Sequence, residues 1–117
     1  MKAVILKADG TAPHVENVKG DLESIKAVVE GWIERVPSLN ESTERRVVVY
    51  ANEEGRIHGL PPNRNMLAIQ ALDLVVSGYI AGNLIVLGKD GHDETDVPED
   101  IIDLLVTPTE TGGTDEW

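Results

Sequence analysis

The segment PPNRN carries the side chains best suited to hold an anion. Asn63, Arg64 and Asn65 fall where an apolar helical pattern begins. Free backbone N–H groups and the helix dipole favour negative charge at such a point, and Arg grips a carboxylate or phosphate with two parallel hydrogen bonds. The segment therefore predicts a ligand-binding site. The alternative interpretation is structural: Asn63 caps the helix, and Arg64 pairs with Glu53 or Glu54.

Three further polar side chains precede this segment. Tyr50 and Asn52 lie at the end of a β-branched run, and His58 follows the turn NEEG. If residues 45–60 form a β-hairpin, positions 50 and 58 approach each other and bring a phenol and an imidazole near the Arg. This arrangement would form the rim of a site for a nucleotide-like ligand. A half-buried Tyr and an exposed His on a strand explain the same residues without a ligand.

Acidic residues crowd the chain after Gly88. Residues 61–117 hold two Lys and Arg against eleven Asp and Glu, whereas residues 1–60 hold eight against ten, and the formal net charge is −11. Such a surface repels nucleic acid and anionic lipid, so neither direct nucleic-acid binding nor membrane binding is expected. An acidic surface that serves only solubility explains the charge. A row of acids that imitates DNA is the alternative, and it rests on Asp93, Glu94, Glu99 and Asp100.

The sequence offers no recognisable catalytic site, metal site or cofactor-binding loop. The three His lie in separate segments, no Ser occupies a nucleophile elbow, and the chain has no Cys. The acidic stretch KDGHDETD lacks the ligand spacing of an EF-hand, which favours a solvated loop over a metal site. We therefore expect no enzymatic activity, no cofactor and no metal, with an uncharacterised enzyme as a further alternative.

The elements that position these residues predict an α/β fold of the α+β type. Apolar and alternating runs predict strands at 2–8, 13–18, 45–51, 56–60 and 84–88, of which the third and fourth form the hairpin at 45–60. Helical spacing predicts helices at 21–36, 63–72 and 98–105. The first helix places Trp32 in the core, and the stretch at 72–83 fits either a helix or a short strand. The expected architecture is a small mixed sheet of about four to five strands packed with two to three helices.

Length indicates a single domain. At 117 residues the chain has the common size of one domain, which we expect to occupy residues 1–106. The remaining residues 107–117, which end in Trp117, are expected to form a flexible acidic tail. No apolar run approaches the roughly 20 residues that span a bilayer, and the lack of Cys fits a reducing compartment, so a cytoplasmic location is expected.

The head MKAVILKADGT, the stretch VVEGWIERVPSL, the pair NEEG and GLPPNR, and the later GNLIVLGKDG occur in this order along the chain. In that order they resemble a phage and bacterial family catalogued as domain of unknown function 3846. The resemblance implies a small accessory protein of a phage or other mobile element, acting in the bacterial host cell, with counter-defence as an expected role. It implies no chemistry.

These features together predict a small non-enzymatic accessory protein. Its expected partner is a small anionic, nucleotide-like ligand or a host protein, bound through the hairpin and the PPNR segment. The alternative is an acidic DNA-mimic inhibitor of a host nucleic-acid-binding protein. Self-association into a homo-oligomer stays open.

Overall fold

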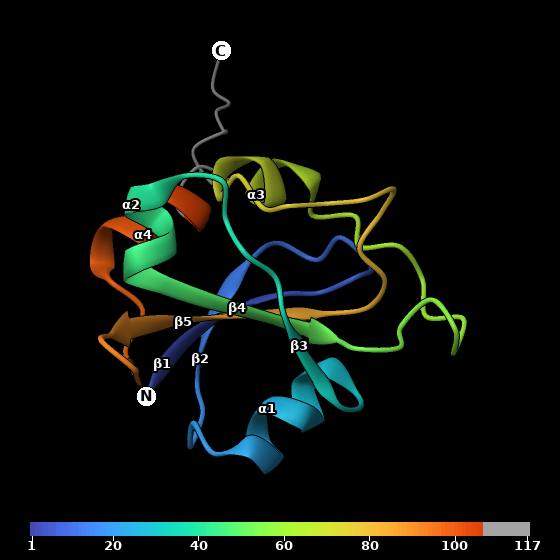
Figure 1. Cartoon of the computed structure of the whole chain (residues 1–117), viewed down its shortest axis with the longest axis horizontal. Helices are drawn as coiled ribbons and strands as arrows, with labels where there is room; N and C mark the ends of the chain where they lie inside the picture. Colours follow the sequence, from blue (N-terminus) through green and yellow to red (C-terminus); the bar gives the residue numbers. More distant parts are fainter. Residues whose placement is uncertain (107–117) are drawn as a thin grey trace.

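The computed structural model describes residues 1–106, which form one sheet with helices on both of its faces (Figure 1). The tail predicted at 107–117, with Trp117, lies outside the described residues. The strands are β1 (Lys2–Leu6), β2 (His14–Asn17), β3 (Ile33–Arg35), β4 (Val47–Asn52), β5 (Leu84–Asp90) and β6 (Asp93–Thr95), and the helices are α1 (Leu22–Val29), α2 (Glu41–Arg46), α3 (Met66–Ala71) and α4 (Glu99–Leu105). The α+β class predicted from the sequence is confirmed.

The sheet has the strand order β2-β1-β5-β4-β3, and β6 pairs with the end of β5. Every pairing within residues 1–106 is antiparallel, so the sheet is antiparallel with six strands and not mixed with four to five. The three central strands are continuous apolar runs because both of their faces are covered. Along β1, for example, Val4 and Leu6 face one layer while Ala3 and Ile5 face the other.

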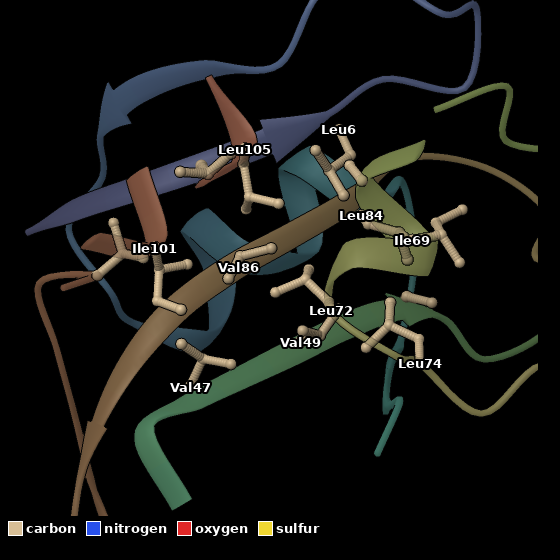
Figure 2. Packing of buried hydrophobic residues seen from close by; sticks show 14 residues of the cluster. Leu6, Val47, Val49, Ile69, Leu72, Leu74, Leu84, Val86, Ile101 and Leu105 are labelled. Atoms are coloured by element: carbon tan, nitrogen blue, oxygen red, sulfur yellow. The ribbon is translucent and has the colours of Figure 1, made fainter. Parts of the chain in front are cut away.

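The larger core lies between the sheet and the helices α3 and α4, while α2 has no buried residue. Figure 2 shows Val86 of β5 and Val49 of β4 packed against Leu72 and Ile69 from the region of α3, with Leu105 of α4 alongside. The smaller core lies on the opposite face, where α1 contributes Ile25 and Val29. Figure 1 shows α1 alone on that face, below the sheet. Hydrophobic burial on two sides therefore fixes which strands are central.

The prediction of a hairpin at 45–60 is wrong for its second strand, at 56–60. Residues 56–60 form no strand, because the chain after β4 coils into successive turns in which His58 N donates to Glu54 O and Leu60 N to Gly55 O. The neighbours of β4 are β5 and β3, both distant in sequence. Ile57, which would have faced the core in a hairpin, is 81% exposed. Long-range pairing thus overrides the local signal of the turn NEEG.

The helix predicted at 21–36 ends after only eight residues. Asp21 caps α1 by accepting a hydrogen bond from Ser24 N, and Glu30 ends the helix in the left-handed conformation with a φ of 68°. The chain then reverses at Gly31 and pairs as β3 with β4. Trp32, predicted in the core, is 62% exposed, with the Lys26 ammonium 3.7 Å from the centre of its ring.

Three smaller corrections concern the loops. The segment 37–44, which belongs to none of the predicted strands and helices, contains the start of α2, whose cap Asn40 accepts from Thr43 N. The helix predicted at 63–72 begins later, at Met66. The acidic stretch after Gly88 is a β5–β6 hairpin, in which Gly88 is required because a Cβ there would lie 2.0 Å from the Asp96 carbonyl oxygen. The helix predicted at 98–105 is confirmed as α4.

Candidate functional site

Asn63, the first predicted ligand-binding residue, is a buried structural bridge. Its side-chain nitrogen donates to the carbonyl oxygens of Leu6 and Gly82, both at 2.9 Å, and its side-chain oxygen accepts from Asn65 N at 2.8 Å. Asn63 is only 4% exposed. The amide therefore ties the end of β1 to the segment before β5. It does not cap α3, and both of its N–H donors are taken up by these contacts, so neither is left for an anionic ligand.

Asn65 is a buried structural residue, as Asn63 is, whereas Arg64 lies at the surface. Asn65 is buried and donates to the carbonyl oxygens of Lys7 and Thr11, at 2.8 and 3.1 Å. Arg64 is exposed, and within residues 1–106 its guanidinium forms no ion pair, whether with Glu53, Glu54 or any other acid. Of the three polar residues in PPNRN, only Arg64 could reach a ligand.

The predicted rim residues Tyr50, Asn52 and His58 do not gather around Arg64. Asn52 is buried and donates to the carbonyl oxygens of Val29 and Glu30, both at 3.1 Å. His58 is exposed, with its Nε2 atom 3.1 Å from Glu54 Oε1. Asn52 and His58 border a small hollow of about 270 Å³ that also touches the exposed Trp32.

Tyr50 makes a different contact, with the acidic hairpin. Its hydroxyl donates to a carboxylate oxygen of Glu94 on β6. Burial, together with this hydrogen bond and the negative charge of Glu94, raises the pKa of Tyr50 to about 12. The phenol is therefore the donor in this pair at every physiological pH and serves as no general base.

Three of the four acids proposed to imitate DNA are engaged within the chain. Asp100 accepts two hydrogen bonds from the Arg46 guanidinium, at 2.7 and 2.8 Å, which hold the pKa of that carboxyl below its usual value. Glu99 lies 3.2 Å from the Lys2 ammonium, and Glu94 accepts from Tyr50. Asp93, the first residue of β6, is exposed beside the turn that joins β5 to β6. Arg46 and Lys2 therefore neutralise part of the predicted acidic row.

A cleft of about 500 Å³ opens at the β3 edge of the sheet. Residues 34–37 form one side, the turns at 53–57 form the second, and the segment 75–81 forms the third. Figure 1 shows the last two segments extending from the same end of the sheet. The exposed apolar side chains along the cleft are Ile57, Val75, Val76 and Tyr79.

The two Arg side chains of the cleft already have partners. Arg56 donates to the carbonyl oxygens of Ser77 and Tyr79 and lies over the Tyr79 ring, with the guanidinium carbon 4.4 Å from its centre. Arg35 forms an ion pair with Glu44 of α2. Arg56 thus fastens the segment 75–81 to the turns after β4, and this fastening creates two sides of the cleft.

Sequence reasoning missed the cleft because it assigned residues 56–60 to a strand. The signal that could have shown it is the stretch at 72–83, which is apolar and interrupted by Gly78 and Gly82, and so fits neither a helix nor a long strand. Both glycines have a positive φ, of 84° and 87°. They turn the chain so that Tyr79 and Val76 stay at the surface.

Residues 1–106 contain neither a cluster of metal ligands nor a helix that could cross a membrane. In this part of the chain no group of three or more Asp, Glu, His or Cys is placed to hold a metal ion. No helix within the same residues has the length and apolar character needed to cross a membrane.

Comparison with known proteins identifies a family. No curated protein and no solved structure matches the chain. The family model described as domain of unknown function (DUF3846) matches residues 1–109, which is nearly the whole chain. The chain belongs to the DUF3846 family.

Proposed function

We propose that this chain is a non-enzymatic binding protein that holds a segment of another protein in the cleft at the β3 edge. The observation that carries the proposal is the row of exposed apolar side chains, headed by Ile57 at 81% exposure, along a hollow of about 500 Å³. Apolar side chains that gather at a concave surface mark a contact site, because leaving them in water costs free energy that a partner can recover.

A protein segment suits the cleft better than a small anion. The two Arg side chains are engaged by Glu44 and by backbone carbonyls, whereas the carboxylates of Glu34 and Glu53 have no ion pair within residues 1–106. An anionic ligand would therefore meet unpaired negative charge. The PPNRN segment offers it only the Arg64 guanidinium. The anion-binding and DNA-mimic hypotheses consequently rank below protein binding.

The biological setting belongs to the same proposal. An accessory protein of a phage or other mobile element, acting inside a bacterial host cell, needs no catalytic site if its role is to occupy a host protein. The state of Tyr50 supports a non-enzymatic role, since its phenol is a fixed donor to Glu94 and its raised pKa of about 12 prevents it from acting as a base at physiological pH.

The test compares two substitutions of similar exposure. Ile57→Asn changes the cleft, and Leu67→Asn changes an 83% exposed side chain on α3 outside the cleft. Neither side chain is buried, so both variants are expected to unfold at the wild-type temperature. Host proteins cross-linked to the wild type should be retained by Leu67→Asn and lost from Ile57→Asn.

Equal retention by the two variants would contradict the proposal. A second arm addresses the anionic ligand. Thermal stabilisation by a panel of nucleotides that disappears in Arg64→Ala would move the site to the PPNRN segment and overturn protein binding through the cleft.

A further inference from the structure

The strand β3 presents an unpaired outer edge. Val36 N donates to Val49 O, and Glu53 N donates to Trp32 O. The backbone N–H and C=O groups of Trp32, Glu34 and Val36 therefore point toward β4. Backbone groups in an antiparallel ladder alternate between the two sides of a strand, so the N–H and C=O groups of Ile33 and Arg35 point away from β4. Within residues 1–106, β4 is the only strand paired with β3.

The chain itself fills the same edge just beyond β3. Val75 N donates to Pro37 O at 2.9 Å, and Leu39 N donates to Asp73 O at 2.8 Å, with Ser38 and Leu74 forming an antiparallel bridge. This pairing stops at Val75. The cleft begins at that point, since residues 34–37 and 75–77 line it from the two sides. The strand position beside Ile33 and Arg35 therefore opens into the cleft.

The charge of this edge selects a basic occupant. Glu34 lies on β3 and Glu53 directly follows β4, and neither carboxylate has an ion pair in the part of the chain that the structure describes. Both line the cleft, next to Val36 and Ile57. A partner with alternating basic and apolar side chains would pair with the acids and cover the apolar surface.

We propose that the partner segment binds as an added β-strand along β3, and that it is extended and rich in Lys or Arg alternating with apolar residues. Main-chain hydrogen bonds to Ile33 and Arg35 give the affinity, while Glu34, Glu53 and the apolar rim give the specificity. This inference rests on the proposed function and specifies the partner's chemistry. A second copy of this chain suits the edge less well, because a two-fold pairing centred on β3 would place Glu34 opposite its own counterpart.

The experiment uses a synthetic peptide of three Lys-Val repeats, blocked at both ends, as the probe. Amide hydrogen exchange is measured by NMR on the full chain with and without the peptide. At a peptide concentration about ten times Kd, exchange at Ile33 and Arg35 is expected to slow by about tenfold. A peptide of three Glu-Val repeats is expected to leave both amides unchanged.

Two variants test the role of charge. Glu34→Lys should weaken binding of the Lys-Val peptide and allow the Glu-Val peptide to bind. Asp103→Lys makes the same change in charge on the exposed face of α4, outside the cleft. This variant should bind the Lys-Val peptide as the wild type does and should not bind the Glu-Val peptide. Methylation of the peptide nitrogens that face β3 should abolish binding, because it removes the donors of the added strand.

The possible failures are distinguishable. Peptide-induced shifts at 53–57 and 75–81 without protection of Ile33 and Arg35 would overturn strand addition while leaving the cleft as a binding site. If the same two amides are protected without peptide, and the protection rises with protein concentration, the edge of β3 pairs with a second copy of this chain and not with a different partner. No response to the Lys-Val peptide would overturn the inference, and the proposed function would then be decided by the Ile57→Asn and Leu67→Asn comparison.

Discussion

The side-chain amide of Asn52, at the end of β4, donates a 3.1 Å hydrogen bond to the carbonyl oxygen of Val29, the last residue of α1. A second bond of the same length reaches the carbonyl oxygen of Glu30. The last carbonyls of a helix have no partners within the helix, so this amide satisfies them from the sheet. Gly31 permits the approach, since a Cβ there would lie 2.6 Å from the Asn52 nitrogen.

Substitution of Asn52 should therefore destabilise the fold. Asn52→Leu removes these two hydrogen bonds, and also the one that the Asn52 side-chain oxygen accepts from Glu54 N, so it is expected to cost about 2–3 kcal/mol in the free energy of unfolding. Asn52→Asp keeps the shape but directs a carboxylate at two carbonyl oxygens, so its cost should be larger and should grow as the pH rises. Urea unfolding measures both values. Asn17→Asp, at an exposed position of β2, is the matched control and should change little; an equal loss in the control would contradict the assignment.

Glu30 adopts a conformation that suits glycine. Its φ of 68° and ψ of 36° lie in the left-handed region, which costs an L-residue about 1–2 kcal/mol. Glu30→Gly should relieve this strain and raise the free energy of unfolding by about 0.5–1 kcal/mol after the greater entropy of the unfolded chain is subtracted. Glu30→Ala removes the charge but keeps the Cβ, so it should give no such gain. A gain shared by both variants would assign the effect to charge.

The sequence predicts those parts of the fold that depend on local pattern. The apolar runs of β1 and β5 and the short helix α4 emerge from it because their burial follows directly from composition. The chain from Glu30 to Arg35 does not, since its apolar spacing continues the helical period while pairing with β4 makes it a strand. Asn63 shows the same limit, because a polar residue before a helix is typical of a cap and also of a buried bridge.

The acidic residues illustrate why surface charge is hard to predict. Asp100 pairs with a residue 54 positions away and Glu99 with one 97 positions away, so their partners depend on the finished fold. The cleft depends in the same way on Arg56, whose carbonyl partners lie more than twenty residues further along the chain. Only the side chains, and not their contacts, are visible in the sequence.

The PPNRN segment should respond to substitution as a structural element. Asn63→Ala removes the buried side-chain donor to the carbonyl groups of Leu6 and Gly82 and is expected to cost about 2–4 kcal/mol in the free energy of unfolding. Arg64→Ala changes an exposed side chain without an ion pair in residues 1–106 and should stay within about 0.5 kcal/mol. Urea unfolding of the two variants separates the contributions. A large loss in Arg64→Ala with little in Asn63→Ala would reverse this assignment.

The pair formed by Arg46 and Asp100 predicts a dependence on acid. Hydrogen bonds and charge from Arg46 lower the pKa of Asp100 below 3.8, so the folded state holds this proton less tightly than the unfolded state. The stabilisation is complete above the unfolded pKa and disappears as the pH falls through the lower folded value. The difference in melting temperature between the wild type and Asp100→Asn should therefore shrink below pH 3.8. A difference that stays constant through this range would show that the pair contributes no charge-dependent stability.

Tyr50 predicts the opposite dependence, at alkaline pH. Its pKa is raised to about 12, first by burial and then by the hydrogen bond to the Glu94 carboxylate, so the folded state holds the phenolic proton more tightly than the unfolded state. The stabilisation is present below the unfolded value near pH 10 and is lost as the pH rises through the folded value. The absorbance of tyrosinate, taken as the difference between the wild type and Tyr50→Phe, isolates this group from Tyr79, the other tyrosine in the chain.

A second variant separates the two causes of that shift. Glu94→Gln removes the charge but keeps a hydrogen-bond acceptor, so it should lower the pKa of Tyr50 only in part, because burial is the larger cause. The matched control is Asp93→Asn, the same kind of change at the neighbouring residue of β6, which makes no contact with the phenol and should leave its titration unchanged. A return of Tyr50 to its ordinary pKa in Glu94→Gln would show that the carboxylate, and not burial, holds the phenol neutral. In that case the charge of Glu94 on the acidic hairpin would by itself account for the raised pKa of Tyr50.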